Sequence, residues 1–273
     1  MADTGLRRGV WLERVPDLVE ACVEEWRLRL GDPYVAGAAG HAVRADLPDG
    51  TPAVLKLIFP HREGEHEAAA LVLLDGDGAV RLLEHDAKRW AMLIERCVPG
   101  DDASSIDDDE AIRVAVATGR ELWRAVAGRP FRRAADEVAR WFRELEAKTD
   151  HPYLGIAAAL YASMTPRHDV LVHGDYHHHN LLRHGDRWLA IDPKPLIAEP
   201  EFDVVTLLWN PLQRALTREL TERRIRQLAS AGLDERRMRD WAIVRGAQLG
   251  LPLHPGEDEA ASRQLSVVRW LLE

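Results

Sequence analysis

The chain has 273 residues, of which 46% are hydrophobic, so it can bury a substantial core and is too apolar for extended disorder. Its formal net charge of −9 argues against a nucleic-acid binder, which needs a basic face, and favours a cationic small-molecule substrate. No apolar run is long enough to cross a membrane, the N-terminal segment lacks the apolar core of a secretory signal, and the two cysteines have no metal-type spacing. We therefore expect a reduced, cytoplasmic protein without membrane partners, whose oligomeric state the composition leaves open.

The chain is predicted to begin with an amphipathic helix over residues 16–30, with Pro16 in its first turn. One face of this helix would carry five apolar side chains: Leu18, Val19, Cys22, Trp26 and Leu30. After it, Gly37 and Gly40 lie in a short segment before the next predicted strand, but two glycines do not make the G-x-G-x-x-G pattern of a phosphate-covering loop. Direct phosphate contact and a simple turn between strands both remain open for these glycines.

A lysine strand followed by an acidic helix comes next. Residues 51–58 alternate apolar side chains around Lys56, as a strand does, and residues 64–74 are rich in helix formers. Such a lysine reaches the α- and β-phosphates of ATP when a helical glutamate holds it. Glu67 is the best partner on the helix and Glu65 is the alternative, whereas a solvated lysine at a sheet edge is the competing interpretation.

Residues 90–95 predict an apolar strand that runs into a Pro-Gly connector. A strand followed by such a connector suits a hinge between two lobes. In kinases the hinge backbone binds the adenine edge, so position alone points to Glu95 and Cys97 as nucleotide-binding residues.

Residues 101–110 carry six carboxylates directly after the expected hinge. Asp107 can cap a helix that begins near Asp108, and acidic residues in the first turn favour the helix dipole. Capping explains Asp101 and Asp102 less well, so we expect these two to face the cleft as candidate substrate contacts.

The rest of the chain is mainly helical, with Gly and Pro between the helical segments. Helices are predicted over residues 108–127, 131–148, 152–164, 201–209, 215–231, 234–250 and 258–272. Together with the strand-rich N-terminal third, this order predicts an α+β, two-lobed, protein-kinase-like fold. The N-terminal lobe would comprise residues 1–97 and the C-terminal lobe residues 98–273.

A short apolar strand is predicted over residues 169–172, and it leads into a loop that begins at His173. Gly174 can adopt backbone angles that other residues avoid, which suits a tight loop that aims Asp175 inward. Taken alone, an aspartate in a loop is as readily a turn former or a helix cap, so the residues that follow carry much of the weight.

Two further strands, residues 180–183 and 187–191, flank a turn at residues 184–186 that contains glycine. A hairpin of that length folds the chain back on itself. It would place Asn180 and Asp192 side by side, although they are distant in the sequence.

Asp175, Asn180 and Asp192 have the residue types and the order that phosphoryl transfer from ATP requires. One carboxylate, Asp175, would orient and deprotonate the acceptor hydroxyl. The amide oxygen of Asn180 and the carboxylate of Asp192 are hard ligands that suit magnesium ions on the phosphates. The set predicts a kinase that uses ATP and Mg²⁺, with ATP between the lobes.

Residues 172–180 and 188–195 resemble the aminoglycoside phosphotransferases, and more closely their streptomycin 6-kinase and hydroxyurea phosphotransferase subgroup. The shared features are a histidine-rich H-G-D-x-H-x-x-N loop, an I-D-P-K-P element and a later L-W-N at residues 208–210. The resemblance covers residues 50–210. It implies Asp175 as the catalytic base, Asn180 and Asp192 as magnesium ligands, and Lys56 on the ATP phosphates, paired with Glu67.

Several neighbouring residues have supporting roles or open roles. His173 would support the catalytic loop by hydrogen bonding, as the resemblance implies, and Asp203 would anchor the loop backbone or cap a helix. Lys194 could contact phosphate or pair with Glu199 or Glu201. The further candidate substrate contacts are Glu199 and Trp209.

The sequence therefore predicts a small-molecule O-phosphotransferase whose acceptor is an aminoglycoside-like aminocyclitol, so that it would confer antibiotic resistance. A kinase of a sugar or other hydroxylated metabolite, and a nucleotide-binding pseudokinase, are the alternatives. A zinc hydrolase built on His173, His177, His178 and His179 is a third, although adjacent histidines lack the spacing of structural zinc sites. The acceptor, the hydroxyl modified and the choice between ATP and GTP stay open.

Overall fold

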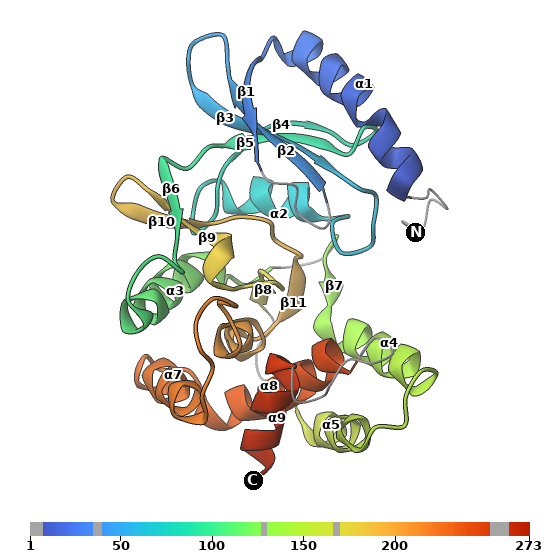
Figure 1. Cartoon of the computed structure of the whole chain (residues 1–273), viewed down its shortest axis with the longest axis vertical. Coiled ribbons are helices and arrows are strands. Elements are labelled where there is room, and N and C mark those ends of the chain that lie inside the picture. The colour runs from blue at the N-terminus through green and yellow to red at the C-terminus, as the bar shows by residue number, and fades with distance from the viewer. Residues whose placement is uncertain (1–7, 35–39, 127–129, 166–169, 252–261) are drawn as a thin grey trace. The chain divides into compact units, whose positions relative to one another are not determined.

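The computed structural model describes residues 8–34, 40–126, 130–165, 170–251 and 262–273. The chain forms two compact units, whose elements are labelled in Figure 1. The first unit comprises Met1–Asp101 and Leu182–Lys194, and the second comprises Asp102–Leu181 and Pro195–Glu273. The sequence predicts a division at residue 97, whereas the first unit continues to Asp101 and also includes the later segment.

An antiparallel sheet with the strand order β1-β2-β3-β5-β4 is the basis of the first unit. Side chains alternate along each strand, so Leu55 and Leu57 are buried on one face of β3 while Lys56 points to the other. The strands are β1 (Arg29–Pro33), β2 (Gly40–Asp46), β3 (Pro52–Ile58), β4 (Leu82–Asp86) and β5 (Ala91–Glu95).

Helix α1 (Arg8–Trp26) packs on the sheet face that carries the two leucines (Figure 1). Its buried Trp11 and Cys22 belong to the same core cluster as Leu55 and Leu57. This apolar burial is what fixes the helix on the sheet.

The predicted bounds of this helix are wrong at both ends. It begins at Arg8 and contains Pro16, which the sequence places in the first turn. It ends at Trp26, and Leu30 is an exposed residue of strand β1 instead of part of the helical apolar face. Periodicity alone does not mark where a helix gives way to an edge strand.

Helix α2 (Glu67–Leu74) carries Ala70, Leu71 and Leu74 buried on one side. Glu67 in its first turn is also buried, because it pairs with Lys56 of β3. The helix therefore packs against the sheet face opposite to α1, as Figure 1 shows.

A hairpin of β9 (Leu181–His184) and β10 (Arg187–Ala190) pairs with β6 (Pro99–Asp102) in the order β10-β9-β6. Backbone hydrogen bonds tie β10 to the first unit: Ala190 N–H donates to the Gly78 carbonyl (2.9 Å), and Val80 N–H donates to the Ala190 carbonyl (3.1 Å). These bonds explain why residues 182–194 belong with the N-terminal sheet rather than with the helical part of the chain, where the sequence places them.

The second unit is mainly helical, and α8 packs against α5, α6, α7 and α9. Asp107 accepts hydrogen bonds from the backbone of Asp109 and Glu110, so it caps α3 as predicted. The helices are α3 (Asp108–Leu122), α4 (Ala134–Glu146), α5 (Pro152–Ser163), α6 (Pro200–Val204), α7 (Arg218–Ser230), α8 (Glu235–Gly250) and α9 (Arg263–Leu272).

Several predicted helices are shorter than expected. The helix predicted over 201–209 is α6 followed by a 3₁₀ turn, η2 (Val205–Leu208), and the one predicted over 131–148 loses its start to strand β7 (Arg132–Arg133). The helix predicted over 108–127 ends at Leu122. Strand β7 pairs with β11 (Leu196–Ala198), which pairs in turn with β8 (Val170–Val172). This tertiary pairing overrides local helix propensity at residues 132 and 133.

No helix within the described ranges is long and apolar enough to cross a membrane. Cys22 and Cys97 are both free and both buried. Burial raises the pKa of each thiol, that of Cys97 to about 12, so neither forms a thiolate readily.

Candidate active site

Lys56 is the central residue of a charged network in the first unit. Its Nζ donates to Glu67 Oε1 at 2.5 Å and to Asp192 Oδ1 at 2.6 Å. Glu65, the alternative partner in the sequence, instead lies 4.0 Å from the neighbouring His66. The strand, the helix and the hairpin each supply one member, so the fold brings together residues that are far apart in the chain.

The electrostatics of this network favour a charged lysine. Burial disfavours the ammonium form, but the carboxylates of Glu67 and Asp192 outweigh it and raise the pKa of Lys56. Only 12% of the Lys56 side chain is exposed, whereas 50% of the Asp192 side chain is exposed. The network therefore presents a fixed cation beside a carboxylate that solvent or a ligand can reach.

Asp192 has a backbone conformation that non-glycine residues rarely adopt. Its φ of 59° lies in the left-handed region, two residues after the end of β10 and before the Pro193 of the I-D-P-K-P element. Strained backbone of this kind persists where the surroundings hold it, and it is common at functional sites. Here the hydrogen bond to Lys56 fixes the direction of the side chain.

The predicted hinge is held by the turn of the β9–β10 hairpin. Val98 N–H donates to His184 Nδ1 (3.3 Å), and Gly185 N–H donates to the Val98 carbonyl (2.8 Å). His184 Nε2 lies 3.6 Å from Glu95 Oε1. Within the described part of the chain, no hydrogen bond occupies the backbone N–H of Cys97, which is the group expected to meet the adenine edge.

The glycine loop is described only in part, because Gly37 lies outside the described residues. Gly40 begins β2, opposite Ile58. A Cβ at Gly40 would lie 2.6 Å from the Leu57 carbonyl oxygen, so close backbone packing explains this glycine.

In the second unit, the buried carboxylate of Asp203 holds the loop that begins at His173 and that the sequence predicts to be catalytic. It accepts hydrogen bonds from the backbone N–H of His173 (2.8 Å) and of Gly174 (2.8 Å), and from the indole of Trp123 (2.9 Å). Gly174 has a φ of 82°, a conformation that glycine adopts without steric cost. Asp203 thus anchors the loop backbone from the side of α6.

Three further side chains fix the other groups of this loop. Arg245 of α8 donates to the Gly174 carbonyl (3.1 Å), and the Thr206 hydroxyl donates to the Tyr176 carbonyl. The fully buried Tyr176 hydroxyl donates to the Ala115 carbonyl (2.7 Å). The loop is therefore bound through both its N–H and its C=O groups.

Asp175 projects from this anchored loop, and 30% of its side chain is exposed. Its backbone N–H donates to His173 Nδ1 (3.2 Å), and its carbonyl accepts from Asn180 Nδ2 (2.9 Å). Because the amide nitrogen of Asn180 is held in this way, Oδ1 is the atom that can face a cation. His177 Nε2 lies 3.6 Å from Asp175 Oδ1, a contact that the sequence does not predict.

The other two histidines of the motif have structural surroundings. His178 is fully buried, and burial together with the charge of Arg224 lowers its pKa to about 3. His179 lies between Asp102 (2.9 Å) and Gln213 (3.1 Å). The described residues contain no group of three histidine, cysteine, aspartate or glutamate side chains arranged to hold a metal ion, which gives no support to the zinc hydrolase alternative.

The remaining residues that the sequence predicts as substrate or phosphate contacts have varied surroundings. Asp102 is engaged with Ser104 and His179, whereas Asp101 is exposed. Lys194 pairs with Glu63 at 3.7 Å, and neither Glu199 nor Glu201 is the partner that the structure shows. Trp209 is 2% exposed, so its ring belongs to the core and offers no surface to a substrate.

Comparison with known proteins decides the family. A profile of the family described as aminoglycoside/hydroxyurea antibiotic resistance kinase matches residues 28–251. The chain belongs to this family. It is therefore a phosphotransferase of the aminoglycoside kinase family, and the resemblance seen in the sequence is confirmed.

Individual relatives agree with this assignment. The streptomycin 6-kinase of Streptomyces griseus is 32% identical over 278 residues, which cover 96% of this chain and 90% of the relative. The hydroxyurea phosphotransferase of Kitasatospora aureofaciens is 32% identical over 276 residues, which cover 96% and 80%. An amicoumacin kinase in complex with AMP-PNP, Ca²⁺ and Ami has a TM-score of 0.67 at 14% identity, over 98% of this chain and 95% of that one.

The fold is thus protein-kinase-like, as predicted, with an N-terminal antiparallel sheet followed by a helical region. Arg245, Thr206, Trp123 and His184 are the residues of this kinase that sequence reasoning missed. Only Arg245 left a signal, since it shares one helical face with Arg237 and Trp241. The others act through single contacts that no spacing rule predicts.

Proposed function

We propose that this chain is an ATP- and magnesium-dependent O-phosphotransferase that phosphorylates a hydroxyl group of an aminoglycoside and so confers resistance to it. The observation that carries the proposal is the Lys56 network, in which one ammonium group is bound by both Glu67 and Asp192. A lysine held in this way is the arrangement that kinases use to bind nucleotide phosphates. The family assignment and the relatives support the same reaction.

In this proposal Lys56 binds the α- and β-phosphates, and Glu67 keeps its ammonium group in place. The adenine edge meets the carbonyl of Glu95 and the N–H of Cys97. His184 keeps this backbone segment in position through Val98. Because backbone groups bind the adenine edge in this proposal, the side chains of the hinge need not be of any particular type.

Asn180 Oδ1 and the half-exposed Asp192 carboxylate are the residues that would hold magnesium. Both are hard oxygen donors, and Mg²⁺ takes few protein ligands besides phosphate oxygens and water. Each donor is oriented within its own unit, Asn180 by the Asp175 carbonyl and Asp192 by Lys56, and amide and carboxylate oxygens suit the chemistry of the ion. Magnesium supplies charge that offsets the charge developing on the transferred phosphoryl group.

Asp175 positions the acceptor hydroxyl and accepts its proton. The transition state of phosphoryl transfer is loose, so alignment of the attacking oxygen matters more than the basicity of the carboxylate. The anchoring of the loop by Asp203 and Arg245 serves this alignment. Removal of a general base costs about 10²–10⁴ in rate, and we expect Asp175→Ala to lose at least the lower figure while it still binds ATP.

The acceptor is proposed to be cationic, because the net charge of −9 attracts cations and the streptomycin 6-kinase is among the relatives. Hydroxyurea is the second candidate, since the hydroxyurea phosphotransferase is equally similar at 32% identity. The deciding experiment measures ATP consumption and phosphorylated product with a panel of aminoglycosides, streptomycin first, then hydroxyurea and sugars. Turnover of a sugar alone would identify a metabolic kinase, and no turnover despite ATP binding would identify a pseudokinase.

A further inference from the structure

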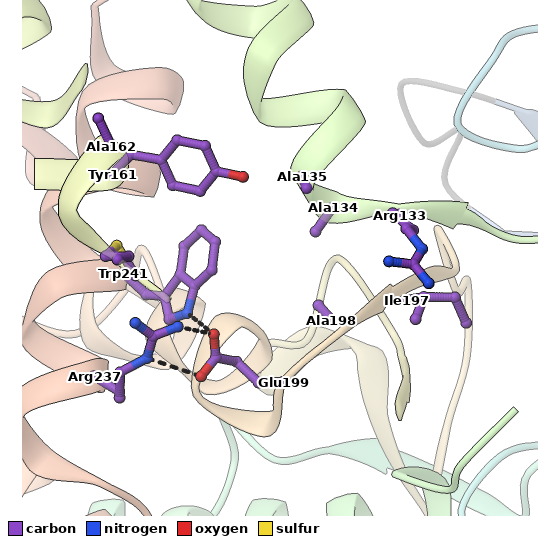
Figure 2. A pocket seen from close by; sticks show the side chains of 11 residues that line it. Arg133, Ala134, Ala135, Tyr161, Ala162, Ile197, Ala198, Glu199, Arg237 and Trp241 are labelled. Atoms are coloured by element: carbon purple, nitrogen blue, oxygen red, sulfur yellow. Dashed lines mark hydrogen bonds and ion pairs between the residues drawn. The ribbon is translucent and has the colours of Figure 1, made fainter. Parts of the chain in front are cut away.

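A cavity of about 310 Å³ lies wholly within the second unit, between α4, α5, β11 and α8 (Figure 2). Its volume is near the lower end of the range of about 300–1,000 Å³ that small-molecule sites span, so it has room for one ring rather than a whole antibiotic. No step of the phosphoryl transfer described above uses it.

The floor of the cavity is a buried polar cluster. Glu199 accepts two hydrogen bonds from Arg237, one of them 2.9 Å from Nε to Oε2, and a third from the Trp241 indole at 2.9 Å. Glu199 is 3% exposed and Arg237 is 5% exposed. The loss of hydration offsets the attraction between the charges of a buried ion pair, so such a pair need not stabilise the fold. The Glu199–Arg237 pair is therefore a candidate for a role in ligand binding.

The walls of the cavity offer an aromatic surface and a hydroxyl group. The Tyr161 ring lies 5.8 Å from the Trp241 ring, centroid to centroid. Figure 2 shows the Tyr161 hydroxyl directed across the cavity toward Ala134 and Ala135 of α4. Among the described residues, no hydrogen bond to this hydroxyl is present, so it can bind a polar group of a ligand.

One face of α8 connects the cavity with the catalytic loop. Arg237, Trp241 and Arg245 follow one another at four-residue spacing, so they point to the same side of the helix. Phe202 packs edge-on against Trp241 at 5.1 Å, and Arg245 lies over the Phe202 ring at 4.2 Å. Arg245 binds the Gly174 carbonyl of the loop, about 12 Å along the helix from Arg237.

We infer that this cavity binds a ring of the acceptor other than the ring that is phosphorylated, and that this ring is hydroxylated and uncharged. The inference rests on the proposed function, since it assumes a multi-ring acceptor whose reacting hydroxyl lies at Asp175. Arg237 at the cavity and Arg245 at the loop are about 12 Å apart along α8, a span that suits a molecule of two or three linked rings.

The charge of the lining decides the class of ring. Glu199 is the one carboxylate among the residues that line the cavity, and Arg237 and Trp241 already bind it. A ring that carries an amino or guanidino group would therefore meet no available carboxylate in this lining, whereas a neutral ring can place its apolar face on Trp241 and a hydroxyl near Tyr161. The cationic part of the acceptor is then bound elsewhere.

The test fills the cavity from an exposed position. Ala135 lines the cavity and is exposed on α4, so Ala135→Phe blocks the space without disturbing the core; Ala139→Phe, exposed on the same helix outside the cavity, is the matched control. With streptomycin as acceptor, we expect Ala135→Phe to raise KM at least tenfold, with kcat and the KM for ATP unchanged, as for loss of uniform binding. Tyr161→Phe should raise the same KM about threefold to tenfold.

The isolated aminocyclitol of streptomycin, which lacks the sugar rings, separates the outcomes. Its KM should be the same for the wild-type enzyme and for Ala135→Phe. An equal rise for both acceptors, or no rise for streptomycin, would overturn the inference.

A separate measurement keeps the cavity testable if the wild-type protein phosphorylates no aminoglycoside, which would refute the proposed acceptor. Saturation-transfer NMR with methyl α-glucoside, a neutral hydroxylated ring, should show binding to the wild-type protein and to Ala139→Phe but not to Ala135→Phe. Absence of binding to the wild-type protein, or binding retained in Ala135→Phe, would refute the cavity as a site for a neutral ring.

Discussion

Asp203→Asn is the sharpest perturbation of the catalytic loop, because it preserves the shape of the side chain and removes only its charge and one acceptor. The carboxylate of Asp203 is 0% exposed and accepts three N–H groups, those of Trp123 and His173 on Oδ2 and that of Gly174 on Oδ1. In the more favourable rotamer of the introduced asparagine, the amide oxygen still accepts from Trp123 and His173, and the NH₂ group faces the N–H of Gly174.

The expected cost follows from that geometry. One buried donor left without an acceptor costs about 1–3 kcal/mol, and the hydrogen bonds that remain lose the charge assistance of the carboxylate. We expect the free energy of unfolding to fall by about 2–4 kcal/mol. Because Gly174 precedes Asp175 directly, kcat should fall at least tenfold while the KM for ATP stays unchanged.

The assay combines urea unfolding with steady-state kinetics of the same preparation. Asp32→Asn is the matched control, since the Asp32 side chain is 92% exposed, and it should leave both quantities unchanged. Wild-type kcat in a stably folded Asp203→Asn protein would refute the view that this carboxylate positions the catalytic loop. A rise in the KM for ATP alone would refute it equally.

Three further predictions follow from single contacts. Burial would raise the pKa of Asp108, but the hydrogen bonds that Asp108 accepts from the fully buried Arg224 outweigh burial and lower this pKa. The ionised Asp108 therefore contributes its full stability at pH values above the ordinary carboxyl pKa, and this contribution is lost as the pH falls. Asp108→Asn should therefore cost about 3–5 kcal/mol in urea unfolding at pH 7 and progressively less toward pH 3, and an unchanged difference across that range would contradict the linkage. His184→Ala should raise the KM for ATP severalfold without changing the KM for the acceptor, because it releases the Val98 N–H; equal changes in both would argue against a role at the hinge. The thiol of Cys97, whose pKa burial raises to about 12, should react with iodoacetamide at pH 8 only under unfolding conditions, and rapid labelling of the native protein would disprove its burial.

Local sequence patterns predicted a large part of the fold. Strand alternation around Lys56 and helix formers after residue 64 gave the correct element types, because both periodicities reflect which face of an element is buried. The Asp107 cap was predictable for the same reason, since it depends on neighbours in the chain. The end of α1 and the start of α4 were not, because strand pairing decides them.

The site, too, has features that the sequence predicts and features that it does not. Sequence spacing identified the family and predicted roles for the acidic and amide residues of the loop, because phosphoryl transfer demands those side chains in that order. Choosing Glu67 over Glu65 needed the direction in which α2 faces the sheet. The prediction for Trp209 failed because an aromatic residue near a motif is as readily a core residue as a ligand contact.

By itself, the sequence determined the reaction class and the fold class, and it predicted Lys56, Asp175, Asn180 and Asp192 as the residues of the site. Only the tertiary structure decided that Asp192 shares the ammonium group of Lys56, and that Asp203 binds the N–H of Gly174 while Arg245 binds its carbonyl. It also showed the cavity over Glu199. The physical reason is that chemistry fixes residue types at short spacing, whereas hydrogen bonds between distant segments depend on packing, which no local pattern records.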